Sequence, residues 1–562
     1  MENIIIVESI STGYNFIADI CARGYHAVSL EARCSNQEEA RKKCYRQIEY
    51  DFELIQEQDT YEETLELVKS YHPVCILPGS ELGVPLATRL ADSLGLWGNP
   101  ASIINAMVTK SGMHEALKAA GVRSIKGQIV RSEEEALNFC LENHLTRAVV
   151  KPLHSAGSVG VTMCDTVDEA MAAVKNSFDT PDYYGKKHDC CLIQERIDGT
   201  EYIVNTISCN GKPRLTSMWR YKKVKTAEGG QIYDYCELIK DLEPGHSEII
   251  EYAFDTVRAI GIQNGMVHGE YMLDKNGPVL IEVNCRPMGG NLPAGYLDAM
   301  LGQHETDSIL DTALHPECFE QKAQEAYHPV RKGCFKFIMV PYDTETMSLP
   351  LWVIASRLRS TYKIDAADRY SVKHYAKTND LKLSGGTVYM LHDDENVLEA
   401  DLQLLREIEA DYFGYILNDG MTKPWFIKAQ DAGRGQSEDL RKLIDHIAPT
   451  GGCLLVTDEK TRIPGNMVVT PDELENVHGM FKNVVIGLQD SLVERNEADA
   501  LELLFDIMDM VRPGGKVYIP ESTYRYISYG RRGTEILLRV LGYSIMAPKP
   551  EDCKCVIGFR KM

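Results

Sequence analysis

The sequence predicts a multidomain protein of the α/β and α+β classes. Its 562 residues are enough for about three or four domains of ordinary size. Short apolar runs alternate with helical segments near both ends of the chain, which is typical of parallel α/β layers. Strand patterns dominate instead at about residues 200–223, which favours a mixed α+β region in between.

The bulk composition excludes several classes of protein. The formal net charge is −22 and no basic stretch is present, which argues against a nucleic-acid partner. The 16 cysteines lack zinc-finger spacing, as expected of buried thiols in a reducing compartment. No apolar stretch has the length of a membrane span, and the first residues do not resemble a signal peptide. We therefore expect a cytoplasmic protein that binds no membrane.

The first 95 residues predict a small parallel α/β layer. Its strands are expected in "NIIIVES", "HAVSLEA" and "PVCILPGSELG". The segments between and after them have helical spacing, namely "GYNFIADICARGY", "YEETLELVKSY" and "GVPLATRLADSLGL". We expect this layer to act as a scaffold.

The following segments predict further units. An amphipathic helix is expected over Ala106–Ala120 and should end at Gly121. A strand, a helix near Glu133–Asn143 and a second strand "RAVVKPL" follow. A mixed segment covers Cys334–Leu417, the small polar residues of Ala429–Asp439 predict a linker, and a last α/β unit should begin near Leu440.

The segment "RAVVKPLHSAGSVGV" has a lysine before a loop of small residues. A Walker loop carries its lysine after the glycines, and no such string occurs in this sequence. Small residues nevertheless let backbone amides fold over an anion, which a lysine on the adjacent strand can reach as a point charge. The candidate phosphate-binding residues are Lys151, Ser155, Ala156, Gly157, Ser158 and Gly160.

A predicted hairpin, "MVHGEYMLDKNGPVLIEVNCRP", carries two carboxylates. Because Pro278 has no N–H, we expect a three-residue loop at 275–277 rather than the two-residue turn that "NG" favours. That register places Glu270 opposite Glu282 and, on the same face, His268 opposite Asn284. Facing carboxylates repel unless a cation lies between them, and Mg²⁺ prefers such oxygen ligands together with phosphate.

Two interpretations of this hairpin compete. Its face could simply be solvated, with the like charges tolerated. The apolar run Val279–Ile281 and Val283 imply burial of much of the hairpin, which favours the metal site. Arg286 lies two residues beyond Asn284 and can point to the same side.

Taken together, these motifs resemble the ATP-grasp superfamily, and within it carboxylate–amine ligases such as the L-amino acid ligases. The resemblance covers about residues 1–420. "VTKSGMHEALKAAGV" is similar to the family's segment with an ATP-contacting lysine, Lys110, and "VVKPLHSAGSVGV" to its second lysine and flap. The resemblance implies that Gln194, Glu195, Arg196 and Ile197 contact adenine and that Glu201 lies near the ribose or the magnesium ion. It implies that Glu270, Glu282 and Asn284 are the metal ligands. It further implies that Arg286 lies beside the acyl phosphate and that His268 orients a substrate group.

The resemblance also implies domains and chemistry. It places a Rossmann-like, pre-ATP-grasp layer at 1–95 and a two-lobed ATP-grasp domain at 96–425, with a lid at about 110–195 and a C lobe at about 196–425. The implied cofactors are ATP and Mg²⁺ or Mn²⁺, and the implied reaction joins a small carboxylate and an amine, both expected to be amino acids, through an acyl phosphate. A homodimer is compatible with the resemblance. The alternatives are a carboxylase that uses bicarbonate, a bifunctional ligase–methyltransferase and a non-catalytic nucleotide-binding protein.

Two further segments leave alternatives open. "SMWRYKK" (217–223) either receives an anionic substrate or forms an exposed edge with solvated lysines. Residues 440–562 resemble the second half of a class I methyltransferase, most closely in "VRPGGKVYI". The glycine pattern that such an enzyme needs after its first strand is absent, so we expect a methyltransferase-like domain without catalysis.

Overall fold

The computed structural model resolves two compact units, Met1–Phe337 with Asn379–Lys382, and Ile338–Thr378 with Leu383–Met562. This division does not follow the expected boundary near residue 425, and the domain limits given above stay a prediction. The structure describes residues 2–33, 37–153, 160–179, 187, 189–225, 231–340, 343, 349–366, 376–378, 383–407, 409, 440, 443, 446–447, 452–458, 463–495, 497–527, 530–546 and 555–560.

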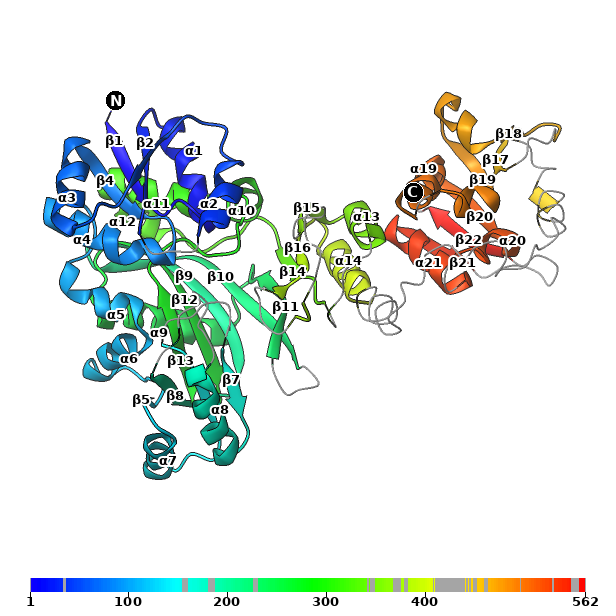
Figure 1. Cartoon of the computed structure of the whole chain (residues 1–562). Helices are drawn as coiled ribbons and strands as arrows, with labels where there is room; N and C mark the ends of the chain where they lie inside the picture. Colours follow the sequence, from blue (N-terminus) through cyan, green and yellow to red (C-terminus); the bar gives the residue numbers. More distant parts are fainter. Residues whose placement is uncertain are drawn as a thin grey trace. The chain divides into compact units, whose positions relative to one another are not determined.

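The first unit begins with a four-stranded parallel sheet in the order β3-β2-β1-β4 (Figure 1, blue). The alternating sequence pattern predicts this parallel arrangement, but it misses α2 and β3. Ile4 and Ile6, which lie on one face of this sheet, share a hydrophobic core with Ile207 and Ile309 from later elements of the first unit. The elements are β1 (Asn3–Val7), α1 (Asn15–Ala22), β2 (His26–Glu31), α2 (Glu38–Tyr45), β3 (Glu53–Gln56), α3 (Tyr61–Ser70), β4 (Pro73–Pro78) and α4 (Val84–Leu94).

The helix expected over Ala106–Ala120 is two helices, α5 (Ile104–Val108) and α6 (Lys110–Ala119). Thr109 separates them with an extended backbone, and its side chain accepts a hydrogen bond from the N–H of Gly112. A threonine in this position is a good N-cap, so it starts a new helix where the apolar period alone predicts continuation. The break makes Lys110 the first residue of α6.

A smaller sheet of four antiparallel strands follows, in the order β5-β8-β6-β7 (Figure 1, cyan). Helices α7 and α8 cover it, and Val130, Phe139 and Val174 lie in their shared core. The elements are β5 (Gly127–Val130), α7 (Glu133–Glu142), β6 (Ala148–Lys151), β7 (Thr162–Cys164), α8 (Val167–Asp179) and β8 (Cys191–Glu195). We call this sheet and its helices the lid.

The largest sheet of the first unit has the strand order β13-β12-β9-β10-β11-β14. Helices α6 and α9 pack on one face through Leu117, Ile249, Val204 and Val267. The side chain of Asn205 therefore faces the other side, since neighbouring residues of a strand alternate. The elements are β9 (Thr200–Cys209), β10 (Lys212–Lys225), β11 (Gln231–Leu238), α9 (Pro244–Ile260), β12 (Gly265–Asp274), β13 (Gly277–Asn284), α10 (Ala294–Leu301), α11 (Glu305–Leu314), α12 (Phe319–Gln324) and β14 (Gly333–Phe337).

The hairpin of β12 and β13 differs from the prediction at its tip. The expected three-residue loop is wrong: Asp274 pairs with Gly277, which leaves only Lys275 and Asn276 in the turn. Gly277 has φ +99°, a conformation that favours glycine. The register then shifts between Glu270 and Tyr271, so Ile281 is an extra residue of β13, a β-bulge.

The second unit contains a six-stranded sheet in the order β18-β17-β19-β20-β22-β21. The first four strands are parallel, whereas β22 is antiparallel to both of its neighbours. The elements of this unit are α13 (Leu349–Arg357), β15 (Thr361–Ala366), β16 (Gly386–Leu391), α14 (Glu395–Glu407), β17 (Cys453–Thr457), β18 (Met467–Val469), β19 (Phe481–Gly487), α18 (Asp490–Val493), α19 (Glu497–Asp509), β20 (Val511–Pro520), α20 (Glu521–Tyr524), α21 (Gly530–Val540), β21 (Tyr543–Met546) and β22 (Cys555–Arg560). The expected linker at Ala429–Asp439 lies outside the described residues.

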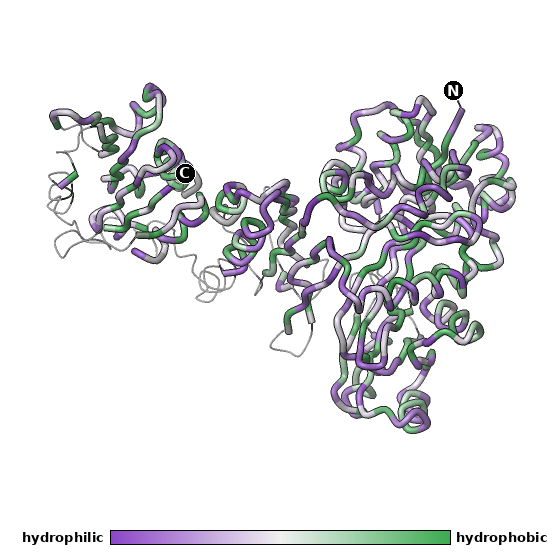
Figure 2. Tube along the Cα trace, turned by 180° about the vertical axis from the view of Figure 1, so that it is seen from behind, coloured by the Kyte–Doolittle hydropathy of each residue, from purple (hydrophilic) through white to green (hydrophobic). Residues whose placement is uncertain are grey.

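Two general expectations can be checked on the described residues. The cysteines there are free thiols, and all except Cys21 and Cys318 are buried. None of the helices in these ranges is both long and apolar enough to cross a bilayer. Figure 2 shows apolar and polar residues interleaved along the chain, as expected of elements with one buried face.

Candidate active site

The predicted pairs across the hairpin are confirmed. Glu270 lies opposite Glu282, and His268 lies opposite Asn284. The bulge produces this register, because a regular ladder from the turn would have paired Glu270 with Ile281. The two carboxylate side chains are 16% and 19% exposed, so both are largely out of solvent.

Lys110 faces this pair from the start of α6. Its Nζ lies 2.5 Å from Oε2 of Glu282. Burial acts to raise the pKa of Glu282, but Lys110 outweighs it and the pKa falls to about 2. Burial raises the pKa of Glu270 to about 7, and the neighbouring Glu282 adds to that rise. The positive charge of Lys110 thus compensates the negative charge of Glu282, one of the two closely placed carboxylates.

Lys151 approaches the same charges from the lid. It is the last residue of β6 and only 6% exposed. Burial, and then the positive charge of Lys110, lower its pKa to about 8, whereas Glu282 and Glu270 act in the opposite direction. Of the small residues after it, Gly160 has φ +74°, while Ser155, Ala156, Gly157 and Ser158 lie outside the described residues.

The next candidates lie on β8 and just beyond it. Gln194 pairs with Val149, so it shares a face of the lid sheet with Lys151. Its Nε2 is buried without a hydrogen-bond partner among the described residues. Glu195 accepts a hydrogen bond from the N–H of Lys126 at 2.9 Å. Arg196 forms an ion pair with Asp165 at 2.7 Å, and Ile197 is half-buried.

Glu201 on β9 is engaged by the cationic segment of β10. Lys223 Nζ lies 2.6 Å from its carboxylate and 4.3 Å from the centre of the Tyr233 ring. Lys222 points outward and is exposed. Because side chains alternate along a strand, the two lysines of "SMWRYKK" point to opposite sides: Lys223 faces the acidic site and Lys222 faces solvent.

Arg286 follows β13 and lies near a carboxylate that the sequence analysis missed. One guanidinium nitrogen donates to the carbonyl of Pro287 at 2.8 Å, and the other lies 3.8 Å from Glu81. Burial raises the pKa of Glu81, and Arg286 opposes that rise. The signal for Glu81 was its place just after a buried parallel strand, where α/β folds bind ligands.

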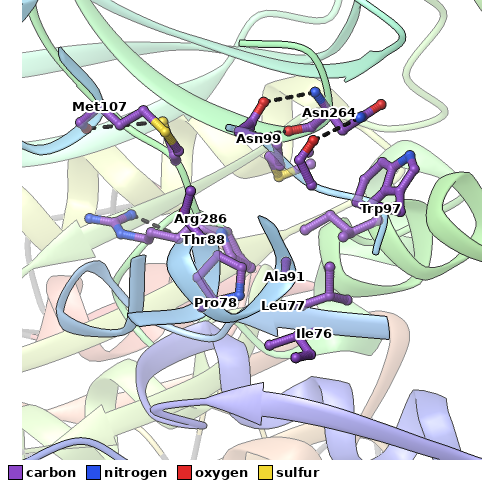
Figure 3. A pocket seen from close by; sticks show the side chains of 17 residues that line it. Ile76, Leu77, Pro78, Thr88, Ala91, Trp97, Asn99, Met107, Asn264 and Arg286 are labelled. Carbon is purple, nitrogen blue, oxygen red and sulfur yellow. Dashed lines mark hydrogen bonds between the residues drawn. The ribbon is translucent and has the colours of Figure 1, made fainter. Parts of the chain in front are cut away.

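Arg286 also borders a small cavity between β4, α4 and β12 (Figure 3). The cavity has a volume of about 40 Å³, which is room for about two or three water molecules. Asn99 closes one side through hydrogen bonds with the backbone of Asn264 at 2.7 and 3.0 Å. This space is too small for a nucleotide or an amino acid, so it is not a substrate site.

The donor set around the hairpin fits a divalent cation. Glu270, Glu282 and Asn284 offer oxygen atoms, and oxygen is the ligand type that Mg²⁺ prefers. Histidine, cysteine, aspartate and glutamate side chains form no complete metal cluster within the described ranges. Mg²⁺ usually keeps waters and takes substrate phosphate oxygens, so two carboxylates are a sufficient protein contribution.

The chain is similar to several known proteins. The family description "Phosphoribosylglycinamide synthetase, ATP-grasp (A) domain" matches residues 108–289. Dapdiamide A synthase of Enterobacter agglomerans is 28% identical over 427 residues, which is 73% of this chain and 97% of that protein. Alanine–anticapsin ligase of Bacillus subtilis is 23% identical over 319 residues, which is 48% of this chain and 65% of that protein.

A solved structure shows the same fold. The L-amino acid ligase of Bacillus licheniformis superposes with a TM-score of 0.57 at 17% identity, covering 72% of this chain and 97% of that chain. These relatives support an ATP-dependent enzyme of the carbon–nitrogen ligase class. The chain is thus similar to the ATP-grasp ligases, in sequence over residues 108–289 and in the relatives that it matches.

Proposed function

We propose that the chain joins a carboxylate to an amine at the expense of ATP, through an acyl phosphate, and releases ADP and phosphate. The observation that carries this proposal is the cross-strand pair Glu270 and Glu282, with Lys110 and Lys151 directed at it from two different elements. The printed names of the relatives, a dapdiamide synthase and an alanine–anticapsin ligase, support amide formation.

In this mechanism the substrate carboxylate attacks the γ-phosphorus of ATP. Charge then spreads over the phosphoryl oxygens, and Lys110, Lys151 and Arg286 stabilise it electrostatically. Glu270, Glu282 and Asn284 would hold Mg²⁺ or Mn²⁺, and the bound ion would supply positive charge that offsets the charge of the phosphates. The lid and its glycine loop would exclude water from the hydrolysable acyl phosphate.

The nucleotide base is assigned to the strand that joins the lid to the large sheet. Gln194, Glu195 and the backbone near Arg196 and Ile197 would contact adenine, and Glu201 would lie near the ribose or the metal. The unpartnered Nε2 of Gln194 supports this placement, because a buried amide without a partner costs free energy unless a ligand satisfies it.

The substrate class is taken from the relatives. We infer that both substrates are amino acids or close analogues and that the product is dipeptide-like. We also infer that the protein works in the cytoplasm, and a homodimer is compatible with this function.

The test is ADP release with a panel of amino acid pairs, with the products identified by mass spectrometry. A ligase needs both a carboxylate and an amine, and hydroxylamine should trap its acyl phosphate as a hydroxamate. ADP release that depends on bicarbonate would identify a carboxylase instead. Nucleotide binding without ADP release under any condition would leave a non-catalytic binding protein.

For residues 440–562 we propose a methyltransferase-like domain that packs or delivers substrates and does not itself catalyse. The antiparallel β22 between β20 and β21 supports the likeness, as do the four parallel strands before it. Calorimetric titration of the full chain with S-adenosylmethionine is the test. Micromolar binding would instead favour a bifunctional ligase–methyltransferase.

A further inference from the structure

One buried histidine lacks a hydrogen-bond partner in the part of the chain that the structure describes. His114 lies on α6 and is 8% exposed. Neither Nδ1 nor Nε2 of its ring meets a donor or an acceptor among the described residues. A neutral imidazole has one N–H to donate and one lone pair to accept, and burying these groups unpaired costs free energy. Such a group needs an explanation, and a partner from outside the chain supplies one.

The ring lies one helical turn beyond Lys110. Residues four apart on a helix share a face, so His114 is directed to the same side of α6 as the lysine that contacts Glu282. Burial, and then the positive charges of Lys151 and Lys110, lower the pKa of His114 to about 4. The histidine is therefore a neutral group close to two ammonium groups.

A purely structural role explains this histidine poorly. Buried histidines in a core are ordinarily held by hydrogen bonds to their neighbours. Met113 and Leu117 already provide the packing of α6 against the hydrophobic core. Within the described ranges the His114 ring adds no hydrogen bond to that packing, so it gives the fold nothing that an apolar side chain would not give.

A second unpaired group lies nearby on the lid. Gln194 is 2% exposed, and its Nε2 has no partner in the ranges that the structure covers. It shares a face of the lid sheet with Lys151. An ideal Cβ on Gly127 would lie 2.8 Å from Cγ of Gln194, so the glutamine side chain crosses β5, which packs beside α6 (Figure 1). Two buried polar groups without partners therefore lie near Lys151, one on α6 and one on the lid.

The order of these residues matches the order of the groups in a nucleotide. The carboxylates of the hairpin mark the end assigned to the metal and the terminal phosphate, and Lys110 contacts one of them, Glu282. Gln194 marks the end assigned to adenine. His114 lies one turn beyond Lys110 and near the lid, between these two ends. The phosphate that is closest to the base of a nucleotide is the α-phosphate.

We propose that His114 is a nucleotide-binding residue whose neutral ring donates an N–H hydrogen bond to the α-phosphate of ATP. This proposal rests on the ligase function proposed above. Lys110 and Lys151 already supply positive charge here. A neutral donor adds a directed hydrogen bond to a charged oxygen and brings no further charge next to the two lysines.

The substitution that removes the donor is His114→Leu, which suits a buried position on a helix. The ring nitrogens are buried without partners among the described residues, so replacing them with an apolar group should raise the Tm of the nucleotide-free chain. The same variant should bind nucleotide more weakly. A histidine that only supports the fold would give the reverse pattern, a lower Tm with unchanged affinity, and that result would overturn the proposal.

Calorimetric titration of the full chain with ADP in the presence of Mg²⁺, with AMP and with adenosine locates the contact. His114→Leu should bind ADP and AMP about 10-fold or more weakly than the wild type, because one hydrogen bond to a charged group contributes about that factor. The ratio of the AMP affinity to the adenosine affinity should fall by the same factor. An equal loss for all three ligands would place the ring at the base or the sugar and refute the α-phosphate assignment.

Two amide variants test whether a hydrogen bond is the cause. His114→Asn and His114→Gln restore an N–H near the positions of Nδ1 and Nε2, respectively. One of them should recover most of the affinity, and its identity reports which nitrogen donates. If both bind nucleotide as weakly as His114→Leu, the hydrogen bond is contradicted. His315→Leu, at a side chain that is 60% exposed, is the matched control and should bind nucleotide as the wild type does.

The two proposals can fail separately. If the wild type binds ADP but joins no carboxylate to any amine, the ligase function fails, and the titrations still decide the role of His114. If ligation occurs and His114→Leu binds ADP and AMP as tightly as the wild type, only the role of His114 fails. A wild type that binds no adenine nucleotide would overturn both.

Discussion

His304, the residue before α11, provides a quantitative test of how α1 is held against α10 and α11. Its Nε2 lies 3.0 Å from both carboxylate oxygens of Asp19, and its Nδ1 lies 2.8 Å from Asp298. A neutral imidazole has one N–H and would turn a lone pair toward one of these carboxylates. Burial opposes the charge, but Asp19 and then Asp298 outweigh it and raise the pKa of His304 from 6.5 to about 9.

The sign and size of the effect follow from linkage. A group whose pKa is higher in the folded state stabilises that state fully below its unfolded pKa, and the stabilisation is lost as pH rises through the folded pKa. The shift from 6.5 to about 9 corresponds to about 3 kcal/mol, because one pKa unit is about 1.4 kcal/mol. The stabilisation should be complete at pH 6 and absent at pH 10. The groups that face the ring are Asp19, Asp298 and the neighbouring Glu305.

The assay is urea unfolding at a series of pH values, comparing the wild type with His304→Gln. The net charge of −22 lowers stability at high pH in both proteins, so only their difference isolates the histidine. That difference should shrink by about 3 kcal/mol between pH 6 and pH 10. A constant difference, or an NMR titration of His304 with a midpoint near 6.5, would refute the reasoning.

Further predictions concern the site itself. Thr109→Ala removes the N-cap of α6 and should cost about 1 kcal/mol of stability in thermal unfolding, whereas Thr109→Ser should cost much less. Gly112→Ala would place a Cβ 2.5 Å from the carbonyl oxygen of Asn105, so it should destabilise more than the cap loss; equal or higher stability would contradict the close packing. Glu282→Ala removes the partner of Lys110 and a metal ligand, and should abolish ADP formation while circular dichroism stays unchanged; full activity would contradict the assignment. EDTA should stop ADP formation, and Mg²⁺ or Mn²⁺ should restore it; activity that survives exhaustive chelation would exclude the metal site.

The sequence predicted most of the elements that carry the site. Apolar periodicity located β1, β2, β4, α1, α3 and α4, and side-chain alternation placed Glu270 and Glu282 on one face. The pairing was correct although the turn was not, because the extra residue expected in the loop is present as the bulge at Ile281. No local sequence pattern predicts a bulge of this kind.

Other features depend on contacts that link distant positions. The break at Thr109 could have been read from its capping residue, but the apolar period continues through it. Asn205 and Glu305 are 100 residues apart and meet only when α11 docks on the sheet. A buried asparagine in an apolar strand was a usable signal, since such a residue needs partners, but its partners cannot be found without the fold.

The bulge at Ile281 also matters for comparing this chain with distant relatives. Loss of that one apolar residue would look damaging in an alignment, yet Glu282 would then follow Leu280 directly, still pair with Glu270 and keep its face. An insertion at the tip, between Lys275 and Asn276, would lengthen the turn and also leave both acids on that face. Gaps in this hairpin should therefore be judged by the side of the sheet on which each acid ends, rather than by the number of residues gained or lost.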